Sequence, residues 1–580
     1  MHIKKLWLGL GSAAALGGVL LAGCMTKLPA TDKVTSIRTL NQGWDDQDRA
    51  FFYRISQGTF TIPLSWMKAL EQPGHGKQSL LMDPEYMSRL GFMSTGGIDH
   101  GEAEGLPIGF AVTRDPQTKV AYVGFNCAAC HTGQINYVDP KDHELKALRV
   151  DGGASLHALD KYREVLLQSL TQTHIDPKRF DRFAARVLGN NPTEEAKNEL
   201  RKGIKKSVEK GFKIGLTEAS KDIYPVKEGF GRLDALQRIS NTVMGYDLED
   251  FHNLRKGTGP VSYPHLWDIG RLDWVQWNGS VRQPMARNVG EALGVFAKLD
   301  LTHTATLFNS TVPVRNLYAI EETLKKLQPP AWPEDIWPLD KQKVAEGKVL
   351  FEKHCTACHG VKTIRGTNEW RTTLVSLDKI GTDPTTARNF MAYTVDASAI
   401  GASSQTHQAE GLQFMTQKVM DNRYKVEHVS AAEKPLLDGE GRKNIVRAPC
   451  GYKARPLDGI WATAPFLHNG SVPNLYELLS PLNERSEKFD VGSYLFDPVK
   501  VGYVTKVHNG SEVDVSTLGN ANTGHIFDNM AGAIGPKLSE QERYAIIEFL
   551  KSYKLDDIPA KTVDRFDSYP CADTQKTYGM

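Results

Sequence analysis

Two stretches of the chain decide its fold, and both end in Cys-X-X-Cys-His: Phe351-Glu352-Lys353-His354-Cys355-Thr356-Ala357-Cys358-His359 and Phe125-Asn126-Cys127-Ala128-Ala129-Cys130-His131. In each stretch a two-residue spacer lets both thiols reach one edge of the same flat ligand, and the adjacent histidine can turn beneath it. Chance does not explain two copies in a chain with only seven cysteines and 17 histidines. The repeat therefore predicts two attachment sites of one kind.

Haem c is the ligand that this pattern fits. The two thiols add across the haem vinyl groups, and the histidine binds the iron from one side. A zinc site would need four ligands, often two paired CxxC units, and here the pairs lie far apart in the sequence. A thioredoxin-type pair does not require the trailing histidine. We therefore predict two covalent haems, bound through Cys127 and Cys130 and through Cys355 and Cys358, with the irons on His131 and His359.

The sequence around the second motif predicts two crossing helices. Val344, Gly347 and Phe351 share one helical face that leads into Cys355, and the glycine would allow a close crossing. Near the end of the chain, Ser539 and Glu542 form a capping box before an apolar stripe. Two such helices are typical of the small class I cytochrome c fold, although ordinary core helices would give the same pattern. The predicted fold class is mainly α, with two cytochrome c-like haem domains, long irregular insertions and few short strands.

Prolines divide the chain into two parts. Pro329-Pro330, followed by Pro333 and Pro338, is the strongest domain boundary. We predict an N-terminal haem domain over 25–330, a C-terminal class I cytochrome c-like domain with a large insertion over 335–556, and a tail over 557–580. The net charge is only +2, from 70 basic and 68 acidic residues, which gives no reason to expect nucleic acid as a partner.

The first 24 residues read as an export signal. Lys4 and Lys5 precede an uncharged, mostly apolar run that ends in Leu21-Ala22-Gly23-Cys24. This ending resembles the bacterial lipobox, which implies a lipid anchor on Cys24. An uncleaved anchor or a non-lipidated signal is the alternative. We expect the mature protein in the periplasm or at the cell surface of a Gram-negative bacterium, and Met25 after the cysteine favours the outer membrane.

Two cysteines remain after the lipid and haem sites are counted. They are Cys450 and Cys571. An even remainder in an oxidising compartment suggests one disulfide, and two separate buried thiols are the alternative.

Several further segments resemble the large di-haem proteins related to bacterial cytochrome c peroxidases, particularly the branch that contains the rubber oxygenases. The matching segments are Phe125 to Gly133, Val275-Gln276-Trp277-Asn278-Gly279-Ser280, Arg287-Asn288-Val289-Gly290-Glu291, Tyr452 to Leu457, Ile460 to Pro473 with its Leu467-His468-Asn469-Gly470-Ser471-Val472-Pro473 end, and Thr523-Gly524-His525. Their order along most of the chain adds to the resemblance.

The resemblance implies a division of labour between the haems. The C-terminal haem would have two protein ligands and handle electrons, whereas the N-terminal haem would expose an iron position to peroxide or dioxygen. His525 is the preferred sixth ligand of the C-terminal haem, with Met530 and His468 as alternatives. For the N-terminal haem no residue stands out as a distal ligand; the histidines considered are His157, His252 and His265.

The resemblance also suggests roles for residues near the rings. His468 would lie close to the haems, and Trp277 between them, so that these two act with His131 in catalysis. Arg287 and Arg455 would neutralise haem propionates, with Arg282 a weaker candidate.

These expectations lead to an oxidoreductase that activates peroxide or dioxygen. A peroxidase would take electrons from a small donor protein, whereas a rubber oxygenase would cleave an apolar polymer with dioxygen. A histidine or glutamate acid/base near the first iron would favour the peroxidase, and an apolar tunnel the oxygenase. The competing hypothesis is a membrane-tethered electron carrier without turnover. Calcium between the domains is a further cofactor that the sequence leaves open.

Overall fold

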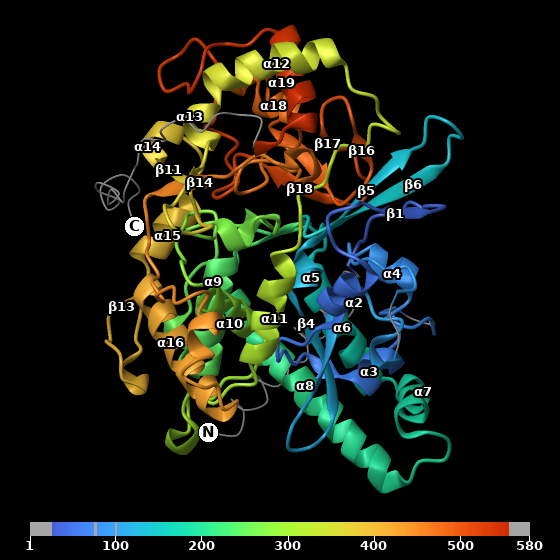
Figure 1. The fold of residues 1–580 in the computed structure, drawn as a ribbon. Coiled ribbons are helices and arrows are strands. Elements are labelled where there is room, and N and C mark those ends of the chain that lie inside the picture. The colour runs from blue at the N-terminus through green and yellow to red at the C-terminus, as the bar shows by residue number, and fades with distance from the viewer. Residues whose placement is uncertain (1–25, 75–77, 99–100, 556–580) are drawn as a thin grey trace, which may run out of the picture.

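The computed structural model describes residues 26–74, 78–98 and 101–555. The predicted signal peptide and lipid anchor, the tail over 557–580 and Cys571 lie outside these residues. Within them, helices are the main regular structure and the strands are short and scattered, the longest being the seven-residue β5 and β6 (Figure 1). None of the helices among the described residues is both long and apolar enough to cross a membrane.

The helices run as follows: α2 Asp46–Arg54, α3 Leu64–Ala69, α4 Pro84–Ser88, α5 Cys127–Cys130, α6 Leu159–Ile175, α7 Pro177–Leu188, α8 Glu194–Ser220, α9 Ala235–Ser240, α10 Pro284–Gly294, α11 Val314–Leu324, α12 Lys341–His354, α13 Thr356–His359, α14 Leu377–Ile380, α15 Thr385–Ala392, α16 Gln408–Val426, α17 Lys434–Leu437, α18 Leu475–Leu478 and α19 Glu540–Ser552. A π-helical turn, η2 Asn241–Asp247, continues α9.

Two three-stranded sheets flank the first motif. One has the order β1 (Ile37–Thr39), β6 (Leu145–Asp151), β5 (Thr132–Val138), and the other β2 (Ile62–Pro63), β4 (Ala121–Phe125), β3 (Phe110–Arg114). The other sheets are two-stranded: β7 Arg232–Leu233 with β8 Val261–Ser262, β9 Lys362–Thr363 with β10 Trp370–Arg371, β11 Thr373–Ser376 with β14 Gly451–Ala454, β12 Thr394–Val395 with β13 Thr406–His407, β15 Lys488–Val491 with β18 Ser511–Asp514, and β16 Phe496–Asp497 with β17 Gly502–Tyr503.

Helices α12 and α19 cross as the sequence predicted (Figure 1). A Cβ atom on Gly347 would lie 1.9 Å from the Ala545 carbonyl oxygen, so only glycine allows this approach. Phe351 and Phe549 fill the crossing, with ring centroids 5.3 Å apart. The predicted capping box forms, because the Ser539 hydroxyl accepts from Glu542 N. This crossing positions Cys355 and α13 directly after α12.

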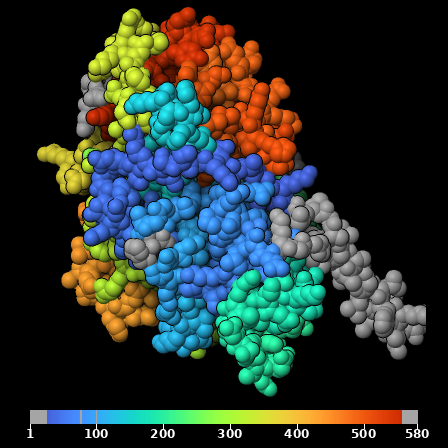
Figure 2. All heavy atoms as spheres, turned by 90° about the vertical axis from the view of Figure 1, so that its right-hand side faces the viewer, coloured from blue at the N-terminus to red at the C-terminus, as the bar shows by residue number. Residues whose placement is uncertain are grey.

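The first motif lies on α5, between β4 and β5. The Asn126 side chain caps this short helix by accepting from Ala128 N, and its amide donates to the Phe52 and Ile55 carbonyls. An aromatic core packs beside it, with Phe125 and Tyr162 rings 5.4 Å apart. Helices α7 and α8 extend from this part of the molecule to one end (Figures 1 and 2).

Segments on both sides of Pro330 pack against each other. Helix α16 lies on α10, Asn136 pairs with Leu495, and Val281 pairs with Val446 as isolated bridges. The largest apolar core holds residues from both predicted domains, including Val289 and Val419. The boundary near residue 330 stays a prediction.

Candidate functional site

His131 is held with one ring nitrogen available for a metal. Its Nδ1 lies 2.7 Å from the Pro264 carbonyl oxygen, so Nδ1–H donates and Nε2 carries a bare lone pair. Burial lowers the pKa of His131 to about 4, against the opposing hydrogen bond to Pro264. The imidazole is therefore neutral at physiological pH, which is the form that binds iron.

His359 repeats this arrangement at the second motif. Its Nδ1 donates to the Arg455 carbonyl oxygen over 2.7 Å. Burial is the main effect on the pKa of His359 and lowers it. Both motif histidines thus present a neutral Nε2, and each takes its orientation from a carbonyl far away in the sequence.

His525 faces His359. The ring centroids are 6.2 Å apart, with the planes at 65°. Two metal–nitrogen bonds of about 2 Å each, added to the extent of the two rings, span roughly this distance. Arg485 holds the backbone here by donating to the Gly524 and His525 carbonyls. Met530, the alternative ligand, is 55% exposed. The geometry fits an iron between His359 and His525.

The three histidines line internal space. His131, His359 and His525 lie deep in the protein, yet each keeps part of its surface uncovered. The same holds for Cys127 and Cys355. Uncovered surface in the interior is what residues around a large flat ligand leave, so these side chains fit covalently bound haem.

Arg455 connects the surroundings of the two motif histidines. Its carbonyl accepts from His359, and its Nη2 donates to the His265 carbonyl over 2.8 Å. His265 follows Pro264, whose carbonyl holds His131. The buried Nε of Arg455 has no partner among the described residues, and burial lowers the pKa of Arg455 to about 10, partly offset by the charge of Asp268. A buried guanidinium with spare donors suits an anion such as a propionate.

Arg287 has a protein partner. It is buried on α10 and forms an ion pair with Glu321, and the Asn288 oxygen accepts two of its hydrogen bonds. Its charge still lowers the pKa of His131, so it lies close to the first motif. Whether it also contacts a propionate stays a prediction.

Glu291 lies next to the first motif and was not singled out by sequence reasoning. After burial, its charge is the main effect that raises the pKa of the Cys127 thiol, and it also raises that of Cys130. Gln276 Nε2 donates to Glu291 Oε1 over 3.1 Å, and burial raises the pKa of Glu291. Glu291 follows Arg287 by one helical turn and ends the segment Arg287 to Glu291, which resembles the di-haem proteins. This position was the feature of the sequence that could have pointed to Glu291.

Trp277 and His468 belong to one hydrogen-bonded group, in which His468 is buried and Trp277 half-buried. Trp277 Nε1 donates to the Ser262 carbonyl over 2.8 Å, and Ser262 N donates to the His468 carbonyl over 2.9 Å. The His468 ring stacks on Tyr452 at 3.9 Å, its Nε2 has no partner among the described residues, and burial lowers its pKa to about 3. The Arg455 guanidinium lies 5.9 Å from the Trp277 ring centroid. This places the group beside the residue that connects the two motif histidines.

The distal candidates for the first haem are engaged elsewhere or exposed. His157 contacts Ser155 Oγ with Nδ1 and Tyr263 Oη with Nε2. His252 is exposed beside Asp250, and His265 stacks on Trp267 at 4.2 Å. Within the part of the chain that the structure describes, no histidine faces His131 as His525 faces His359.

Two other expectations have partial outcomes. Cys450 is disulfide-bonded, but Cys571 lies outside the described residues, so their pairing stays a prediction. No group of three or more His, Cys, Asp or Glu side chains among the described residues is arranged to hold a metal ion, and calcium between the domains stays a prediction.

Paired cysteines, neutral histidines with a bare Nε2 and crossing helices define a c-type cytochrome. Comparison with known families agrees: residues 344–432 match the cytochrome c family, and residues 451–490 match the RoxA-like, cytochrome c-like family. The chain is thus a c-type cytochrome of the RoxA-like kind with covalently bound haem c.

Similar proteins are found in Sinorhizobium fredii (strain NBRC 101917 / NGR234). The uncharacterized protein y4iJ is 36% identical over 580 residues, covering 90% of this chain and 94% of y4iJ. The uncharacterized protein y4iM is 31% identical over 277 residues, covering 45% of this chain and 56% of y4iM. The chain belongs to the family of y4iJ.

Proposed function

We propose that this protein is a di-haem oxidoreductase that turns over peroxide or dioxygen at the His131 site and moves electrons through the His359 site. A haem iron bound at each motif supplies the electron transfer and, at His131, a position for the oxidant. Export, a lipid anchor on Cys24 and a location at the outer membrane are part of the same proposal. They would bring the protein into contact with a small electron-donor protein or an apolar substrate outside the cytoplasm.

The difference between the two histidine sites carries this proposal. The ring centroids of His359 and His525 lie 6.2 Å apart, so the two side chains would bind one iron from opposite sides. His131 has no such histidine opposite it among the described residues, so one side of its iron would stay open to an oxidant. A closed site suits electron transfer with little reorganisation, whereas chemistry on peroxide or dioxygen needs an open position.

Glu291 favours peroxide over dioxygen as the oxidant. Its charge raises the pKa of the Cys127 and Cys130 thiols, so the carboxyl group lies near the first motif. Burial raises the pKa of its carboxyl group, which brings it closer to the range where it can take a proton from one peroxide oxygen and return it to the other. Gln276 Nε2 holds the carboxylate in place.

Peroxide turnover by Glu291→Gln tests the role of this carboxyl group. We expect a loss of about 10²- to 10⁴-fold with unchanged haem content, because general acid–base catalysis contributes roughly this factor. Glu322→Gln, on the partly exposed Glu322, is the control and should keep full activity. Full turnover by Glu291→Gln would contradict the role of Glu291 and favour the dioxygen reaction.

His131→Ala tests the site itself. Turnover should be lost while the spectrum of the C-terminal haem persists, and retained activity would move the reaction to the other haem. The electron-carrier alternative has its own test in the native protein. Spectra that are low-spin in both oxidation states, together with no binding of carbon monoxide or cyanide, would rule out the catalytic proposal.

A further inference from the structure

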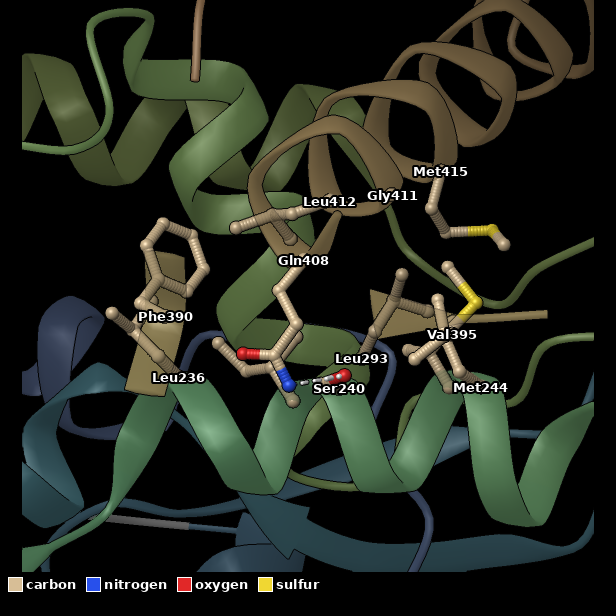
Figure 3. Close-up of a pocket in the computed structure, with 12 residues that line it drawn as sticks. Leu236, Ser240, Met244, Leu293, Phe390, Val395, Gln408, Gly411, Leu412 and Met415 are labelled. Atoms are coloured by element: carbon tan, nitrogen blue, oxygen red, sulfur yellow. Dashed lines mark hydrogen bonds between the residues drawn. The ribbon is translucent and has the colours of Figure 1, made fainter. Parts of the chain in front are cut away.

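An apolar pocket lies between α9, η2, α10, α15 and α16 (Figure 3). Its walls are mostly aliphatic, aromatic and methionine side chains: Leu236, Val243, Met244, Leu293, Phe390 and Met415. Ser240 and Gln408 are the polar side chains that line it. Leu293 lines the pocket from α10, the helix that also carries Arg287 and Glu291. The pocket is distinct from the residues of the two haem motifs.

A chain of amides fixes which atom of Gln408 faces the pocket. Asn241 Nδ2 donates to the Arg255 carbonyl over 2.9 Å, and its Oδ1 accepts from Arg255 N over 3.0 Å, so the backbone sets its orientation. Gln237 Nε2 must then donate to Asn241 Oδ1, over 2.9 Å, which leaves Gln237 Oε1 as an acceptor. Gln408 Nε2 donates to that oxygen over 3.0 Å and to Ser240 Oγ over 3.2 Å. The Gln408 oxygen is therefore the atom left for the pocket.

This oxygen has no donor from the protein. Gln408 is only 4% exposed, and within the described residues nothing donates a hydrogen bond to its Oε1. Figure 3 shows the amide nitrogen turned to Ser240 and the oxygen turned away from it, into the pocket. The apolar walls offer this oxygen no donor, so a ligand hydroxyl in the pocket can supply the hydrogen bond that it lacks. The structure thus presents one directed acceptor inside an apolar space.

We propose that this pocket binds a short aliphatic alcohol or a similar small molecule with an apolar body and one hydroxyl group. The hydroxyl donates to Gln408 Oε1, and the body packs against the walls. Ser240 Oγ lies next to the same amide and can also contact the ligand oxygen. Met244 and Met415 have flexible side chains that adapt to the shape of the ligand. This site goes beyond the proposed peroxide chemistry and does not depend on it.

Calorimetric titration of the full-length, haem-loaded protein tests the site. The probes are 3-methyl-1-butanol and its methyl ether, which has the same apolar body but no donor. The alcohol should bind the native protein about tenfold more tightly than the ether, the effect of one hydrogen bond to a buried acceptor. Equal affinities, or no binding of the alcohol, would overturn the proposal without bearing on the haem chemistry.

Two variants locate the binding. Gln408→Met removes the acceptor at similar size, and it should weaken alcohol binding about tenfold while ether binding stays the same. Met415→Trp should fill the space and abolish binding of both probes. Gln417→Met is the matched control, because Gln417 lies further along α16 and does not line the pocket. Unchanged alcohol affinity in both pocket variants would place any binding elsewhere.

Discussion

At the scale of single residues, the histidines of the two motifs are oriented by backbone carbonyls. His131 donates to Pro264 and His359 donates to Arg455, each over 2.7 Å. A carbonyl partner fixes the tautomer and makes the other nitrogen a better ligand. The two sites differ in the residue that faces the motif histidine. At the second motif this residue is His525, whose ring faces His359.

Replacing His525 with alanine should convert the C-terminal haem from low-spin to high-spin, because one side of its iron would lose its ligand. Electron paramagnetic resonance and absorption spectra of the oxidised protein measure this change. Met530→Leu serves as the comparison and should leave both haems as they are. A spectral change in Met530→Leu and none in His525→Ala would reassign the ligand.

Asp234 should make stability depend on pH. Burial raises its pKa to about 7, against opposing hydrogen bonds from Gly259 N and Gln237 N. The folded state then binds the proton more tightly than the unfolded chain, whose aspartates have pKa values of about 4. The free energy of unfolding should therefore fall between about pH 4 and pH 7, by about 4 kcal/mol for this group, and not change further above that range.

Asp234→Asn, which keeps a residue suited to cap α9, should remove this slope. Urea denaturation of both proteins at several pH values measures the difference between them. Parallel pH profiles would show that the carboxyl group ionises as easily when folded as when unfolded.

At the scale of helices, the crossing of α12 and α19 depends on the absence of a side chain at Gly347. The contact is with the Ala545 backbone, which cannot turn aside as a side chain could. Because protein interiors are close-packed, such a contact leaves no room for an added side-chain atom at Gly347. The crossing also fixes where the segment of Cys355 and His359 begins.

Gly347→Ala should destabilise the protein by about 1–3 kcal/mol or more, since the helices must move apart to accept the methyl group. Gly215→Ala, on exposed α8 with open space around the glycine, is the matched control. It should stabilise by about 0.5–1 kcal/mol through the better helix propensity of alanine. Chemical denaturation followed by circular dichroism compares the two, and equal effects would mean that the crossing is looser than described.

At the scale of the whole molecule, the segments before and after Pro330 share a core. Helix α16 packs on α10, where a Cβ atom on Gly290 would lie only 3.3 Å from Leu412 Cδ1. The bridges of Val281 with Val446 and of Leu272 with Trp370 add contacts across the same boundary. Arg455 joins the surroundings of the two motif histidines.

Because of this shared core, unfolding should be one cooperative transition rather than two. Far-ultraviolet circular dichroism and the haem absorption of both sites, followed during urea denaturation, should give coincident curves. Two separated transitions, one for each haem, would instead support independent domains.

The sequence alone predicted the paired cysteines as haem attachment sites with a histidine beside each pair, and it predicted the two helices that cross at the second motif. These features are local, because the spacing of a few residues sets the chemistry or the helical face. Tertiary structure decided the rest. It brought His525 opposite His359, the carbonyls of Pro264 and Arg455 to the motif histidines, Glu291 to the first motif, and Gln408 to its pocket. Sequence spacing carries no record of such contacts, since they form only when distant segments pack together.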